Sequence, residues 1–124
     1  MAMNNDIGTV STVMHDTTDL DGAVAFWTTI LGLEVIHRDE SYVYLSRLAP
    51  DGPHLAFQLV PEVKESKNRL HLDIRVSDRL AFADKVVAMG GSALAEHQHG
   101  EYPVWNVMAD PQGNEFCIYS AKSA

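Results

Sequence analysis

The sequence contains a single cysteine, Cys117, among its 124 residues. One thiol cannot form an internal disulfide or supply several thiolates to a zinc site, so burial of apolar side chains must hold the fold together. The chain also lacks an apolar run close to the roughly 20 residues that a membrane helix needs. Its first residues have neither the basic flank nor the apolar stretch of a signal peptide. We therefore expect a cytoplasmic protein with no membrane partner.

Basic side chains are scarce as well: 9 Lys and Arg stand against 17 Asp and Glu, which gives a formal net charge of −8. Nucleic acids and anionic membrane surfaces bind clustered Lys and Arg, so we expect no nucleic-acid partner. Glycine-rich phosphate-binding motifs and the serine nucleophile motif GxSxG are absent too. The whole chain has 46% hydrophobic and 21% charged residues. This is the composition of one ordinary globular domain.

The first half of the chain predicts one strand, one helix and then three strands. The β-branched stretch 8–16 suits a strand, Asp19 can cap the following helix, and Gly32 can end it. Three short apolar runs, separated by charged and turn-forming residues, then predict strands at 33–37, 42–48 and 54–60. This half therefore has the order βαβββ.

The second half repeats this order after a charged connector, 61–68. A strand over 71–76 precedes a helix that begins after Asp78 and ends at Gly90-Gly91. Further strands are predicted at 93–97, 102–108 and 115–119, the last two joined by a type I turn at Asp110-Pro111-Gln112-Gly113. We expect an α+β fold of two βαβββ modules, 7–60 and 69–120, joined by the linker 61–68.

Three segments of the chain carry a family resemblance. They are Asp19-Leu20 with Ala25-Phe26-Trp27 and Leu31-Gly32-Leu33, then Lys67 to Asp73, and finally Ala109 to Cys117, which includes Asp110-Pro111-Gln112-Gly113-Asn114. In these segments the chain resembles the glyoxalase / bleomycin resistance / dioxygenase superfamily, also called vicinal oxygen chelate proteins, in its glyoxalase-like branch. The resemblance implies a single domain over 1–124, a cup-shaped mixed β-sheet, a small molecule and often a divalent metal inside the cup, and a homodimer.

The resemblance also implies four positions for metal ligands, which in this chain hold Thr12, Gln58, His71 and Cys117. Only His71 is a ligand of the usual kind, whereas catalytic zinc needs about three. We therefore expect no stoichiometric metal in the isolated chain, and the cofactor is unknown. If a metal does bind, we expect His71 and Glu115 to hold it; the alternative is that Glu115 pairs with Arg69 or Arg75.

The predicted strand around His71 carries more titratable and charged side chains than any other predicted strand. Alternation places Arg69, His71, Asp73 and Arg75 on one face and the apolar Leu70, Leu72, Ile74 and Val76 on the other. We expect His71 to act as a general base that Asp73 orients, and Arg69 and Arg75 to hold an anionic or carbonyl-bearing small organic molecule. The alternative is a solvated sheet face with a ladder of Asp and Arg.

Other residues are expected to complete the walls of the cavity. Thr12, Met14 and Asp16 share one face of the first strand, and His54 and Gln58 share one face of a later strand. Trp105 and Tyr102 either stack on a planar ligand or pack in the core, and Cys117 is either a cavity residue or a small buried hydrophobe. His97 and His99 are expected to form an exposed pair beside Gly100.

Two functions from different classes remain open. The first is an enzyme, a lyase or isomerase of the superfamily, that uses His71 with Asp73. The second is a non-catalytic protein that sequesters a drug or metabolite, as bleomycin resistance proteins do. A fold by itself does not decide between them.

Overall fold

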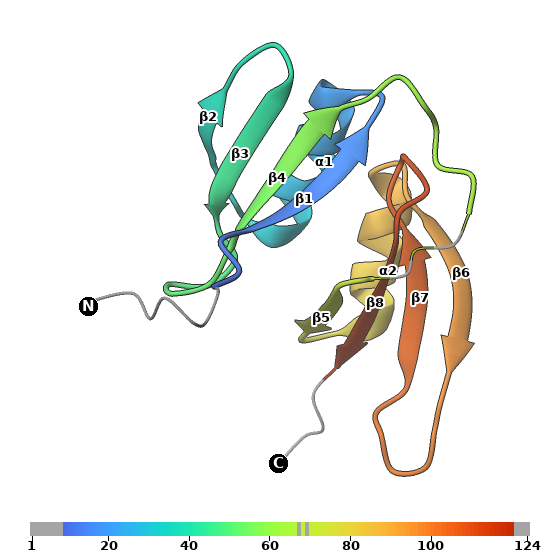
Figure 1. Cartoon of the computed structure of the whole chain (residues 1–124). Helices are drawn as coiled ribbons and strands as arrows, with labels where there is room; N and C mark the ends of the chain where they lie inside the picture. The colour runs from blue at the N-terminus through green and yellow to red at the C-terminus, as the bar shows by residue number, and fades with distance from the viewer. Residues whose placement is uncertain (1–8, 67, 69, 121–124) are drawn as a thin grey trace.

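The computed structural model describes residues 9–66, 68 and 70–120, which form the helices and strands of two modules. The first module consists of β1 (Thr12–Thr17), α1 (Leu20–Leu31), β2 (Val35–Arg38), β3 (Tyr42–Arg47) and β4 (His54–Leu59). The second consists of β5 (Asp73–Val76), α2 (Arg79–Ala88), β6 (Ser92–His97), β7 (Trp105–Ala109) and β8 (Glu115–Ser120). The predicted βαβββ order of each half is confirmed, and the modules lie side by side (Figure 1).

Each module contains a four-stranded mixed sheet. The strand orders are β1-β4-β3-β2 and β5-β8-β7-β6, so the two sheets have the same topology. β1 runs parallel to β4 and β5 runs parallel to β8, while the other neighbours are antiparallel. No helix of the described residues is long and apolar enough to cross a membrane.

The predicted caps and turn form as expected. Asp19 accepts a hydrogen bond from the Gly22 N–H at 3.0 Å, and Asp78 accepts one from the Ala81 N–H at 3.1 Å. α1 ends at Gly32, whose φ of 67° is the left-handed conformation that glycine adopts without strain. The Gly113 N–H donates to the Asp110 carbonyl at 2.9 Å, which closes the turn before β8.

Parts of the predicted pattern are wrong. The strand expected over 102–108 begins only at Trp105, which leaves Tyr102 in the preceding loop, and the strand expected over 8–16 begins only at Thr12. The strand expected from His71 begins only at Asp73, and Leu70, which was assigned to the buried face, is 89% exposed. Alternation places side chains only where the backbone is paired as a strand, and Leu70 lies before the strand. Leu72 and Ile74 do pack against the core.

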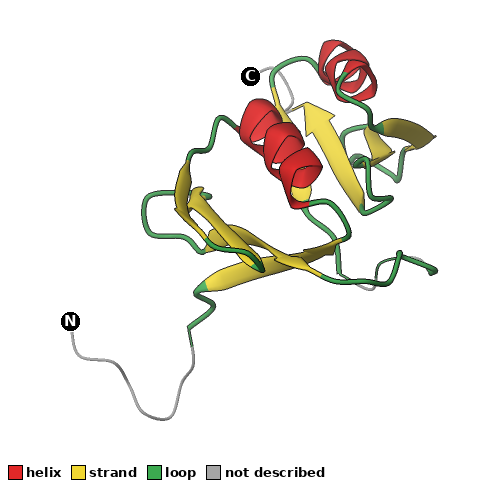
Figure 2. Cartoon of the chain, turned by 90° about the horizontal axis from the view of Figure 1, so that it is seen from above, coloured by secondary structure: helices red, strands yellow, loops and turns green. Residues whose placement is uncertain are grey.

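One core joins the two modules. α1 lies between the sheets (Figure 2), and the Phe116 ring of β8 contacts the rings of both Phe26 and Trp27, with centroids 6.2 and 5.0 Å apart. The Trp27 indole N–H donates to the buried Asp110 carboxylate at 3.0 Å. The helix-covered faces of both sheets therefore share this core, and the opposite face of each sheet is left for a site.

Candidate functional site

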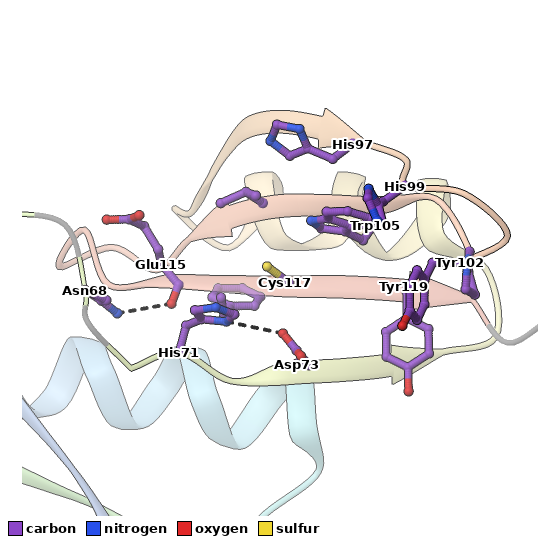
Figure 3. A pocket seen from close by; sticks show the side chains of 13 residues that line it. Asn68, His71, Asp73, His97, His99, Tyr102, Trp105, Glu115, Cys117 and Tyr119 are labelled. Atoms are coloured by element: carbon purple, nitrogen blue, oxygen red, sulfur yellow. Dashed lines mark hydrogen bonds and ion pairs between the residues drawn. The ribbon is translucent and has the colours of Figure 1, made fainter.

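The second module has a cavity on the sheet face opposite α2 (Figure 3). Its volume is about 760 Å³, which is in the range of small-molecule sites. Every residue that lines it lies between Asn68 and Tyr119, so the first module contributes none. We call this cavity the module-two pocket.

The polar end of the module-two pocket holds His71, Asp73 and Cys117. Asp73 lies directly opposite Cys117 in the parallel β5–β8 pairing, and His71 precedes Asp73 by two positions. The His71 Nδ1 is 3.2 Å from an Asp73 carboxylate oxygen. One candidate ligand atom from each of the three residues lies within 4.8 Å of the other two. The predicted His71–Asp73 pair is therefore present in the geometry, and Cys117 lies next to it.

Glu115 lies in the same lining but has other partners. Its carboxylate is 3.1 Å from the Lys64 ammonium group, and its backbone carbonyl accepts from the Asn68 side-chain amide at 3.1 Å. The sequence suggested Arg69 or Arg75 as its partner. Arg69 lies outside the described residues, and Arg75 is an exposed side chain that is not part of the pocket lining. Lys64 of the connector 61–68 is thus the cationic partner of Glu115, which the sequence pattern did not indicate.

The other end of the module-two pocket is aromatic. Trp105 and Tyr119 are register partners on β7 and β8, and the His97 ring lies 5.6 Å from the Trp105 ring. His99 and Tyr102 stack at 6.0 Å in the loop between β6 and β7 (Figure 3). Trp105 and Tyr102 line the pocket, where each could stack on a planar ligand.

The sequence did not indicate that the rings of His97, His99 and Tyr119 line the pocket. His97 and His99 are exposed, as expected, yet they also line the pocket. Tyr119 follows Cys117 by two positions on the same strand, so strand alternation would have found it. The β6–β7 hairpin brings His97 beside Trp105 and His99 beside Tyr102. The conformation of this loop cannot be deduced from a local sequence pattern.

The structure separates the predicted residues of the first module from this pocket. Thr12 lines a second cavity of about 800 Å³ between the modules, where His71 and Glu115 also lie. His54 faces Thr12 in the β1–β4 pairing and its Nδ1 contacts the Leu45 carbonyl at 2.9 Å, while Gln58 faces Asp16. Neither His54 nor Gln58 lines either cavity.

His15 lies on the core side of β1, away from Thr12, as alternation predicts. Its ring meets the rings of Trp27 and Phe57 edge-on at 5.4 and 5.7 Å. Burial lowers the pKa of the His15 imidazole, and the carboxylates of Asp110 and Asp16 act in the opposite direction with smaller effect. Among the described residues its Nδ1 has no hydrogen-bond partner. This histidine is therefore a half-buried ring with a lowered pKa, and it lines the second cavity rather than the module-two pocket.

The chemistry available in the module-two pocket is proton transfer, stacking and ligation of a cation. A histidine oriented by a carboxylate can take and return a proton near neutral pH. Trp105, Tyr102 and Tyr119 offer faces on which a planar molecule stacks. Of the side chains that could ligate a metal, His71, Asp73 and Cys117 fit one ion together, whereas Glu115 is already paired with Lys64.

Comparisons with known proteins bear on the family and the fold. A family model described as glyoxalase-like domain matches residues 12–119. Among the curated proteins, none matches this chain. The fold is similar to that of a glyoxalase-related enzyme from Fulvimarina pelagi, with 19% identity, coverage of 93% of this chain and 89% of the other, and a TM-score of 0.74.

Two further solved structures show the same fold. A glyoxalase/bleomycin resistance protein/dioxygenase family enzyme from Burkholderia phytofirmans PsJN has 21% identity, coverage of 93% and 100%, and a TM-score of 0.72. A bleomycin resistance determinant encoded on the transposon Tn5 has 19% identity, coverage of 94% and 100%, and a TM-score of 0.64. These solved glyoxalase and bleomycin resistance proteins share the fold of this chain. The matched family model spans both modules and both sheets, and the chain belongs to the glyoxalase-like domain family.

Proposed function

We propose that the chain binds a planar organic molecule in the module-two pocket and that His71, oriented by Asp73, moves a proton on that molecule. The observation that supports this is the 3.2 Å contact between His71 and Asp73 within the lining of the cavity. A ligand stacked on Trp105 at the aromatic end would extend its reactive group toward this pair. The reaction class is that of a lyase or isomerase, in which a base removes a proton beside a carbonyl.

The charge of the lining favours a neutral or cationic ligand over an anionic one. Asp73 contributes a carboxylate, the Glu115 carboxylate is paired with Lys64, and the described lining contains neither lysine nor arginine. The expectation of an anionic ligand rested on Arg69, which lies outside the described residues, and on Arg75, which does not line the pocket. We therefore propose a neutral aromatic ketone or aldehyde as the substrate class.

The experiment compares His71 with a second His–Asp pair that has the same separation. His37 and Asp39 also lie 3.2 Å apart, but they belong to the first module and line neither cavity. The probe is 2-hydroxyacetophenone in D₂O, and NMR follows exchange of its carbon-bound protons beside the carbonyl. We expect the native chain to catalyse exchange, His71→Ala to abolish it, and His37→Ala to leave it unchanged. Equal effects of both substitutions would contradict the proposal.

Sequestration without chemistry is the second candidate, and the aromatic lining favours it. Trp105, Tyr102, Tyr119 and the imidazoles of His97 and His99 form walls that need no reaction to bind a ligand. A solved structure with this fold is named a bleomycin resistance determinant. Bleomycin is therefore the second probe. Quenching of Trp105 fluorescence that Trp105→Phe removes, with no proton exchange on either probe, would favour sequestration.

We also propose that the chain forms a homodimer. The family cup needs a first-module face opposite a second-module face, yet the lining of the module-two pocket comes from one module alone. A second copy would supply the missing wall, with Thr12, His54 and Gln58 as its polar residues. Sedimentation velocity tests this assembly.

A further inference from the structure

A partly buried ion pair lies where the two cavities of the chain adjoin. Lys64 of the connector 61–68 and Glu115 of β8 are 3.1 Å apart, and their side chains are only 23% and 16% exposed. Glu115 lines both the module-two pocket and the second cavity, whereas Lys64 lines the second cavity alone. The Lys64 ammonium group therefore reaches the Glu115 carboxylate from the side of the second cavity.

Strand alternation places the carboxylate of this pair on the pocket face of β8. Glu115, Cys117 and Tyr119 follow one another at intervals of two positions, and all three line the module-two pocket. Figure 3 shows Glu115 at the end of the pocket where His71 lies, with Tyr102 and Tyr119 at the other end. The charge at Glu115 thus lies at the polar end, to which the carbonyl group of a stacked ligand would extend.

The connector is attached to strands on both sides of Lys64. The Val60 N–H donates to the Thr17 carbonyl at 2.9 Å, and the Asn68 side-chain amide donates to the Glu115 backbone carbonyl at 3.1 Å. Of the described residues that line the two cavities, Lys64 is the only lysine or arginine. Lys64 is therefore the cation of the described lining whose removal changes the charge beside Glu115.

We propose that Lys64 determines the charge specificity of the module-two pocket, an inference that rests on the proposed function. With Lys64 in place, an uncharged planar ketone enters beside an ion pair that has no net charge. Removal of Lys64 takes one positive charge from a partly buried position, where charges interact more strongly than in water. The pocket then favours a ketone that carries a positive charge near its carbonyl group.

The test compares two ketones of the same shape, phenacyltrimethylammonium and neopentyl phenyl ketone, in which a carbon replaces the charged nitrogen. Quenching of Trp105 fluorescence measures both dissociation constants. Lys64→Met keeps most of the stem and removes the charge, and should tighten binding of the cationic ketone about 10-fold relative to the uncharged one. Glu115→Gln should shift the ratio in the opposite direction, because Lys64 then repels the cation. The double variant should return the ratio to its native value.

Two control variants separate the charge of Lys64 from its packing and from the net charge of the chain. Lys64→Arg retains the cation and should retain the native ratio. Lys85→Met removes a lysine of α2 that lines neither cavity, and should change neither dissociation constant. Circular dichroism melts verify the fold of every variant. An unchanged ratio in Lys64→Met, or the same shift in Lys85→Met, would overturn the role of Lys64.

Proton exchange on 2-hydroxyacetophenone is a separate readout, so each proposal can fail alone. A native chain that catalyses no exchange, but whose Lys64→Met variant shows the shift in ratio, would contradict only the proton transfer. A native chain that catalyses exchange, with the same ratio in Lys64→Met, would contradict only the charge specificity.

Discussion

At the scale of single residues, His15 shows how the core constrains a titratable group. Its ring is enclosed by Trp27 and Phe57, and among the described residues its Nδ1 finds no hydrogen-bond donor or acceptor. Burial disfavours the charged imidazolium, and this effect outweighs the attraction of Asp110 and Asp16. The pKa of His15 in the folded chain therefore lies below the value of 6.5 that it has when unfolded.

This shift predicts a loss of stability on acidification. Between the lowered folded pKa and 6.5 the unfolded chain binds more protons at His15 than the folded chain, so the free energy of unfolding falls as the pH decreases through that window. His15→Phe keeps an aromatic ring and removes the titration, and should flatten this part of the pH profile. Urea unfolding at several pH values measures it. A slope that stays unchanged in His15→Phe would contradict this assignment.

At the scale of helices and strands, the sequence pattern was sufficient for the order of elements and for most faces. Asp19 and Asp78 marked the helix starts because their carboxylates accept from backbone N–H groups of the first turn. The period of two placed Asp73 and Cys117 correctly on their strands, whereas His71 lies two positions before its strand begins. It could not show that Asp73 and Cys117 are register partners, because pairing depends on both strands and on the connections between them.

Gly91, just after α2, gives a prediction at this scale. A Cβ at this position would lie 2.6 Å from the Ala109 carbonyl oxygen and 2.6 Å from a methyl carbon of Val86. Gly91→Ala should therefore lower the free energy of unfolding by about 1 to 3 kcal/mol, since backbone or core must move. Urea unfolding provides the measurement. Gly100→Ala meets nothing within 4 Å, so its cost should be limited to the strain of its positive φ, about 1 kcal/mol.

In the whole molecule, side-chain hydrogen bonds between the modules add to the core that the modules share. The Trp27 indole donates to Asp110, and the Thr18 hydroxyl donates to the Gln112 side-chain carbonyl at 2.8 Å. Sequence patterns marked Asp110 only as the start of a turn, since a residue pair separated by 83 positions leaves no periodic signal. For the same reason the sequence could not show which sheet faces enclose the pocket.

The hydrogen bond between Trp27 and Asp110 should contribute to the free energy of unfolding. Trp27→Phe retains an aromatic ring in the core but removes the donor to a buried carboxylate, which should lower the free energy of unfolding by roughly 1.5 to 3 kcal/mol. Chemical unfolding measures this loss. Trp105→Phe, a change in the pocket wall rather than the core, should cost clearly less. Equal losses would show that the hydrogen bond contributes little to the junction.

The open face and the strand edges of the first module favour assembly of two copies. The open face of the first module carries Thr12, Met14 and Gln58, β1 and β5 each end their sheet with an unpaired edge among the described strands, and Met14 is 37% exposed. A strand edge and a partly apolar face favour pairing with another copy. We expect sedimentation velocity at micromolar concentrations to show a species of twice the chain mass.

A substitution on that face sharpens the test. Met14→Asp places a charge on the open face of β1 and should shift the equilibrium toward monomer, because a buried unpaired carboxylate is costly in an interface. Val87→Asp changes a residue of α2 that is 50% exposed, and should leave the dimer intact. If the native chain sediments as a monomer throughout, His54 and Gln58 have no route to the module-two pocket. The ligand must then be held by the second module alone, with Trp105 and Tyr119 as its wall and His71 at its polar end.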